Sequence, residues 1–108
     1  MKAYKIHLIR HAMTEENLDG KYIGQTDVPA SEYGLRQIKD IIEEYGGYPE
    51  VDAVVSSPLK RCTETAKLIY PDKEPMILNG LIEYDFGEFE GRTADEMKDD
   101  DAFKTWLA

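Results

Sequence analysis

The stretch VDAVVSSPLKR, residues 51–61, joins a short apolar run to the pattern of a helix start. Its valine-rich first half is typical of a strand that is buried on both faces of a parallel sheet. Ser57 and Pro58 are typical of the cap and first turn of a helix, and we expect this helix to continue to about Ile69. The stretch therefore predicts a buried strand that leads directly into a helix.

The same alternation continues on both sides of this stretch. Residues 4–9 predict an earlier strand, and residues 76–81 predict a later one. Between the first two strands, a helix is expected to begin after Ser31 and to end at Gly46 and Gly47. Alternating strands and helices are typical of an α/β fold with a parallel sheet and crossover helices.

A last helical segment is expected near the end of the chain. Thr93 and Glu96 have the spacing of a capping box, and we expect the acidic run at residues 99–101 to interrupt the helix that follows.

Composition and net charge indicate the class of protein and disfavour some kinds of binding partner. The 108 residues are 42% hydrophobic and 32% charged, which is typical of one ordinary globular domain. The formal net charge of −9 opposes binding to nucleic acid or to an anionic membrane surface, so any phosphate that this chain binds should be a small one. Cys62 is the only cysteine, and we see neither a signal peptide nor an apolar run of membrane-spanning length, which favours a cytoplasmic protein.

The cations that could bind such a phosphate follow two of the predicted strands. In LIRHAMTEEN, residues 8–17, Arg10 and His11 come directly after the first strand, and Arg61 follows the second. Ligands of parallel sheets gather at the carboxyl ends of the strands, so these side chains should converge. Two guanidinium groups can bind phosphoryl oxygens, and they would lower the pKa of the imidazole, which favours its neutral, nucleophilic form.

Four stretches, in order along the chain, resemble the motifs of the histidine phosphatase superfamily: LIRHAMTEEN, YIGQTDVPASEYG, VVSSPLKRCTETA and LIEYDFGEFEG. That superfamily includes cofactor-dependent phosphoglycerate mutases and ribazole-phosphate phosphatases, and the last stretch is most similar to the latter. The resemblance implies that His11 is the phosphorylated nucleophile and that Glu83 is the acid that protonates the leaving oxygen. It further implies substrate or phosphate contacts by Arg10, Asn17, Ile23, Gly24 and Arg61. It implies no metal ion and no organic cofactor.

Some positions depart from the family pattern. Ala12 replaces a glycine, which would add strain if the backbone there had a positive φ. Met13 and Ile23 replace residues that are usual in mutases, which weakens a mutase assignment. Family members carry a second histidine in a later S-H-G-G motif, whereas the only other histidine here, His7, is interpreted as structural.

The resemblance therefore implies a three-layer α/β sandwich with a mostly parallel sheet, present here only as its amino-terminal part. Residues 1–108 would form one truncated domain with an exposed sheet edge, and pairing with a second copy of the chain would cover that edge. Asp85, Glu88 and Glu90 are interpreted as surface acids.

The expected function is hydrolysis of a small phosphorylated metabolite through a phosphohistidine, in the manner of a ribazole-phosphate phosphatase. Two alternatives stay open: a phosphoglycerate mutase, and a catalytically incompetent fragment that only binds anions or partners.

Overall fold

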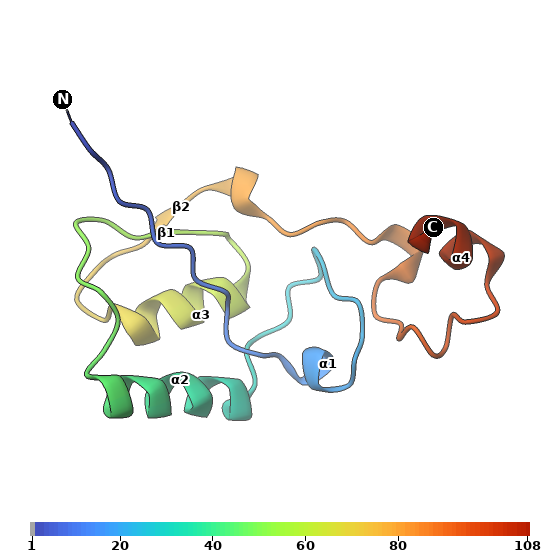
Figure 1. The fold of residues 1–108 in the computed structure, drawn as a ribbon, viewed down its shortest axis with the longest axis horizontal. Helices are drawn as coiled ribbons and strands as arrows, with labels where there is room; N and C mark the ends of the chain where they lie inside the picture. The colour runs from blue at the N-terminus through green and yellow to red at the C-terminus, as the bar shows by residue number, and fades with distance from the viewer. Residues whose placement is uncertain (1) are drawn as a thin grey trace.

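The computed structural model describes residues 2–108 and has an α/β fold (Figure 1). Its helices are α1 (Glu15–Leu18), α2 (Glu32–Tyr45), α3 (Lys60–Ile69) and α4 (Asp101–Leu107), its strands are β1 (Val55–Ser56) and β2 (Met76–Ile77), and short 3₁₀ helices cover Asn79–Leu81 and Gly87–Phe89. The two strands pair in parallel, with Val55 opposite Met76. None of the helices in residues 2–108 has the length and apolar character needed to span a membrane.

Helix α2 begins and ends where its local signals predict. The Ser31 hydroxyl accepts a hydrogen bond from the Gly34 amide at 2.9 Å, which caps the first turn. Gly46 ends the helix with a φ of 78°, a left-handed conformation that glycine adopts without steric cost. Both boundaries of this prediction are confirmed.

Helix α3 ends at Ile69 as predicted but begins two residues later than the sequence indicates, at Lys60 rather than at Pro58. Ser57 accepts a long hydrogen bond from the Leu59 amide, at 3.3 Å, and the helix starts only at Lys60. The Lys60 amide donates instead to the Asp27 carboxylate at 2.7 Å. The cap therefore comes from a distant loop rather than from the preceding residues.

The predicted strand at residues 4–9 is wrong as secondary structure, because this segment has no backbone hydrogen bond to any other residue in the range 2–108. Ile6 is 80% exposed and Leu8 is 93% exposed. A strand is stable only where a neighbour satisfies its backbone groups. The other two predicted strands are confirmed in position and parallel direction but are reduced to two paired residues each. The predicted burial of the earlier of these strands on both faces is wrong, because Val55 is 45% exposed.

The carboxyl-terminal helix α4 starts later than predicted. The Thr93 hydroxyl accepts from the Glu96 amide at 3.1 Å, but residues 94–99 form turns rather than a helix. The Asp100 carboxylate accepts from the amides of Ala102 and Phe103 and so caps α4. The acidic run therefore starts a helix instead of interrupting one.

The arrangement of these elements is open. In Figure 1, α3 lies between the strands and α2, and α4 lies at the far end of the molecule with a separate core of Phe89, Met97 and Phe103. The radius of gyration is 16.3 Å, compared with about 13 Å for a compact domain of this length. The predicted class, an α/β fold with parallel strands and an incomplete set of layers, is confirmed.

Candidate active site

The segment that carries His11 is held by both long helices. The Ala12 amide donates to the Thr65 hydroxyl of α3 at 2.8 Å, and the Met13 carbonyl accepts from the amide and hydroxyl of Ser31. Gly34 of α2 packs so closely that an added Cβ would lie 2.6 Å from the Met13 nitrogen. Among the described residues only glycines have a positive φ, so Ala12 is accommodated without backbone strain.

The His11 ring is half-buried and has a defined orientation. Its Nδ1 lies 2.7 Å from the Ala12 carbonyl oxygen. Because a carbonyl oxygen can only accept, Nδ1 must carry the proton in this hydrogen bond. In the neutral ring the lone pair is then on Nε2, which is the nitrogen available for attack on an electrophile.

The pKa of His11 lies below its ordinary value of 6.5, chiefly because burial disfavours the charged ring. The hydrogen bond to the Ala12 carbonyl raises this pKa, the positive charges of Arg61 and Arg10 lower it, and the Glu83 carboxylate raises it. The expected lowering by the two arginines is present, but burial is the larger cause. The result favours a neutral imidazole near pH 7.

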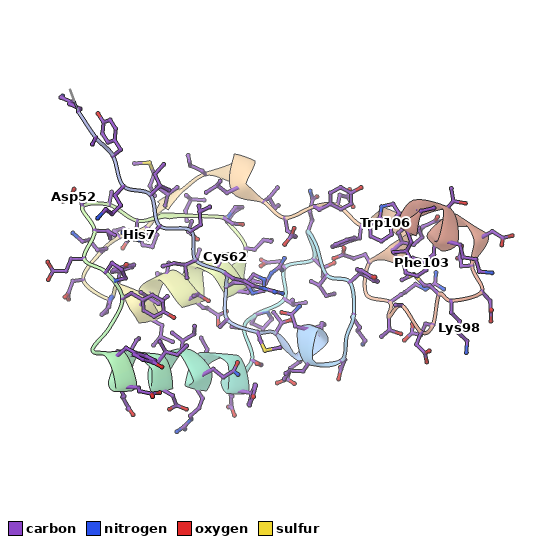
Figure 2. The ribbon with its side chains drawn as sticks, in the orientation of Figure 1. His7, Asp52, Cys62, Lys98, Phe103 and Trp106 are labelled. Atoms are coloured by element: carbon purple, nitrogen blue, oxygen red, sulfur yellow. The ribbon has the colours of Figure 1, made fainter. Side chains whose placement is uncertain are left out.

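A groove of about 1090 Å³ runs beside this ring. Arg10, His11 and Glu83 line it together with the amino-terminal segment, residues 50–57 and one face of α3. Figure 2 shows His7 on the amino-terminal segment and Cys62 on α3, which form two sides of the groove. The structure therefore brings three of the predicted site residues to one hollow.

Arg61 was expected to converge with Arg10 and His11, but it is not among the residues that line the groove. Its side chain is 1% exposed, and its terminal nitrogens donate to the carbonyl oxygens of Thr26, at 2.8 Å, and of Gly24. A guanidinium has five N–H donors, so these two bonds leave others for an oxyanion. Arg61 acts electrostatically on His11 from this position.

Residues 23–27 connect Arg61 to the rest of the site. The Glu90 carboxylate accepts from the Gly24 amide at 2.9 and 3.0 Å and from the Thr26 amide at 3.1 Å. Glu90 is a partly exposed surface acid, as interpreted, but its carboxylate also holds the backbone of Gly24 and Thr26. Because its partners are 64 and 66 residues away, no local pattern in the sequence indicates this role.

Gly24 also fixes the segment that carries Glu83. An added Cβ at Gly24 would collide with the Tyr84 carbonyl oxygen, so the two backbones are in direct contact. The Gln25 side chain donates to the Glu83 carbonyl oxygen at 3.2 Å. The Glu83 carboxylate itself is exposed and accepts from the Tyr84 amide at 2.9 Å.

Asn17 and Ile23 are not among the residues that line the groove. The Asn17 side chain accepts from the Thr14 amide, and the Thr14 hydroxyl accepts from the Asn17 amide, both at 3.0 Å. This reciprocal pair is a capping box that starts α1, and the Thr-x-x-Asn spacing could have indicated it. Ile23 is half-buried next to Gly24. Substrate contacts by these residues stay predictions.

Comparisons with known proteins agree with this arrangement. Residues 6–108 match the sequence profile of the Histidine phosphatase superfamily (branch 1). The chain is 31% identical over 106 residues to an adenosylcobalamin/alpha-ribazole phosphatase of Escherichia coli, covering 94% of this chain and 52% of the relative. It is 35% identical over 107 residues to phosphoserine phosphatase 1 of Hydrogenobacter thermophilus, covering 95% and 50% respectively.

A solved structure is similar over the same part of the chain. The phosphoserine phosphatase of Entamoeba histolytica in complex with 3-phosphoglyceric acid superposes with a TM-score of 0.76 at 37% identity, covering 90% of this chain and 48% of that one. The chain thus spans about half the length of the relatives that it matches.

Proposed function

Because the chain belongs to the histidine phosphatase superfamily (branch 1), we propose that its site hydrolyses a small phosphomonoester through a phosphohistidine on His11. The observation that carries the proposal is the half-buried imidazole whose Nδ1 is engaged by the Ala12 carbonyl, beside two arginines that lower its pKa. This combination supplies a neutral nucleophile next to donors for an oxyanion.

The reaction would proceed in two steps. Nε2 of His11 attacks phosphorus, the bond from phosphorus to the leaving oxygen breaks, and that oxygen takes a proton from Glu83. Water then attacks the phosphohistidine, the phosphorus–nitrogen bond breaks, and Glu83 takes a proton from the water. Arg10, which lines the groove, would hold the phosphoryl oxygens, and the buried charge of Arg61 would stabilise them electrostatically. Neither step needs a metal ion or an organic cofactor.

The substrate is proposed as a small phosphorylated metabolite. The named relatives are an alpha-ribazole phosphatase and phosphoserine phosphatases, which favours hydrolysis over the mutase reaction. The net charge of −9 disfavours nucleic acid and anionic membranes as partners. The single cysteine supports our placing the protein in the cytoplasm.

The groove supports a second proposal about partners. Tyr4, Ile6 and Leu8 are more than three-quarters exposed, on a segment that has no backbone partner within residues 2–108. Val55 and Met76 of the sheet are exposed as well. An unpaired edge with apolar side chains favours association with another chain. We propose that a second copy of this chain covers it. A chain that only binds anions or partners remains the alternative function.

Turnover of p-nitrophenyl phosphate and acid-labile phosphate on the protein test the enzymatic proposal. His11→Ala should abolish both signals, while His7→Ala, which removes the other histidine of the groove, should retain them. If wild type and His11→Ala release phosphate at the same rate, the phosphohistidine mechanism is wrong for this chain. Isomerisation of 3-phosphoglycerate in the presence of its bisphosphate would instead support the mutase alternative.

A further inference from the structure

We infer that Glu90 is a positioning residue of the phosphate site, which holds Arg61 beside His11 through residues 23–27. The inference rests on the proposed function only for the identity of the bound anion. Glu90 does not line the groove, so it acts through other residues rather than on the substrate.

The segment is held on two sides at the same two residues. Arg61 donates to the carbonyl oxygens of Gly24 and Thr26, and Glu90 accepts from the amides of Gly24 and Thr26. Gly24 and Thr26 are thus each bonded to Arg61 through the carbonyl oxygen and to Glu90 through the amide. Hydrogen bonds to ionised groups are stronger than neutral ones, so this arrangement favours one position of the segment.

Glu90 is in turn held by its own neighbours. The Tyr22 amide donates to the Arg92 carbonyl at 2.9 Å, and the Gly91 amide donates to the Tyr22 carbonyl at 2.7 Å. These bonds fix Glu90 at the start of residues 23–27. The far end of the same segment caps α3, because the Asp27 carboxylate accepts from the Lys60 amide, directly before Arg61.

The ionisation of Glu90 supports its role as a partner of Arg61. Burial raises the pKa of Glu90, but the hydrogen bonds from Thr26 and Gly24 and the charge of Arg61 lower it, and the net pKa lies below its ordinary value of 4.5. Glu90 is therefore ionised near pH 7. Its negative charge partly offsets that of Arg61, which in turn lowers the pKa of Glu90.

Three variants test the inference: Glu90→Gln, which removes the charge; Glu90→Asp, which keeps the charge on a shorter side chain; and Glu88→Gln, a control at an exposed acid nearby. The first readout is the titration of the His11 ring by NMR. The second is the exchange rate of the Gly24 and Thr26 amides. The third is the affinity of the full chain for orthovanadate, a phosphate mimic.

The direction in which the pKa of His11 changes distinguishes two effects of Glu90→Gln: displacement of Arg61, and loss of a negative charge alone. Removing a carboxylate charge alone would lower the pKa of His11, whereas displacement of Arg61 would raise it. We expect Glu90→Gln to raise this pKa, to speed exchange of both amides and to weaken vanadate binding about tenfold. Glu90→Asp should lie between Glu90→Gln and wild type, and Glu88→Gln should match wild type.

An unchanged or lowered His11 pKa in Glu90→Gln, with both amides still protected, would overturn the inference. If Glu90→Gln does not fold, Glu90→Asp decides by the same two criteria. A wild-type chain that binds no vanadate and forms no phosphohistidine would contradict the proposed function instead, and the titration and exchange readouts would still decide the role of Glu90.

Discussion

Gly24 has no room for a side chain, and this makes it the most constrained position of the site. Gly24→Ala would place a Cβ against the Tyr84 backbone, which cannot move away as a flexible side chain could. We expect a loss of about 1–3 kcal/mol in the free energy of unfolding, measured with urea.

Gly80→Ala is the matched control, because nothing lies within 4 Å of the added Cβ there. Its effect should stay within about 0.5 kcal/mol. Equal losses in the two variants would contradict the close contact between Gly24 and Tyr84.

The lowered pKa of His11 predicts a pH dependence of stability. The unfolded chain takes up this proton near pH 6.5, whereas the folded chain resists it until a lower pH. The stabilisation by neutral His11 is therefore complete above about pH 6.5 and is lost as the pH falls toward the folded pKa.

Urea unfolding of wild type and His11→Gln, from about pH 7.5 to about pH 5, measures this effect because Gln does not titrate there. The stability of wild type relative to His11→Gln should decrease as the pH falls. A difference that stays constant across this range would show that His11 keeps its ordinary pKa in the folded chain.

Helix α3 holds the nucleophile segment through one hydroxyl. Thr65 is 4% exposed, donates to the Arg61 carbonyl within its own helix and accepts from the Ala12 amide. Thr65→Val would leave that buried amide without its partner, at a cost of about 1–3 kcal/mol in urea unfolding.

Thr63→Val is the matched control on the same helix. Thr63 also donates to a carbonyl of its own helix, that of Lys60 at 3.2 Å, and its hydroxyl accepts from no distant amide. The change should cost less than about 0.5 kcal/mol. If the two variants lose equal stability, the bond to Ala12 contributes nothing.

The elements show which parts of the fold a sequence can predict. Helix α2 was predictable because Ser31 and Gly46 act on their own neighbours. The strand at residues 4–9 was not, since its stability depends on a pairing partner that the apolar pattern does not reveal. The start of α3 was missed for a similar reason, because its cap is Asp27, from a distant loop.

In the site, too, features that depend on neighbouring residues were predictable, whereas features that depend on distant contacts were not. The placement of Arg10 and His11 at one groove was expected from a strand at residues 4–9, and both residues line the groove although that segment is not a strand. The enclosure of Arg61 by backbone carbonyls and the role of Glu90 depend on contacts across the fold. Such contacts leave no periodic signal in the sequence.

At the scale of the whole molecule, apolar surface is distributed unevenly. The aromatic side chains of Tyr22, Phe86 and Trp106 pack together with Phe89 and Phe103 beside α4, with ring centroids 5.4 to 6.0 Å apart. Among residues 2–108, no cluster of paired aromatic side chains fills the groove at the other end. Self-association is therefore expected at the groove rather than at α4.

Glutamate substitutions at Leu8 and at Leu107 test where the chain self-associates, because both substitutions change the net charge equally. Leu8 is 93% exposed on the segment that lines the groove, and Leu107 is 61% exposed on α4. In sedimentation experiments we expect wild type to associate more strongly at about 0.5 M than at about 0.05 M salt, because salt screens the repulsion between chains of charge −9.

Leu8→Glu should weaken this association at least tenfold, since burying one leucine contributes about 1.5–3 kcal/mol. Leu107→Glu adds the same charge away from the groove and should weaken it much less. Equal weakening by both variants would mean that net charge alone controls association. A wild type that stays monomeric at every concentration and salt level would rule out a second copy as the chain that covers the groove.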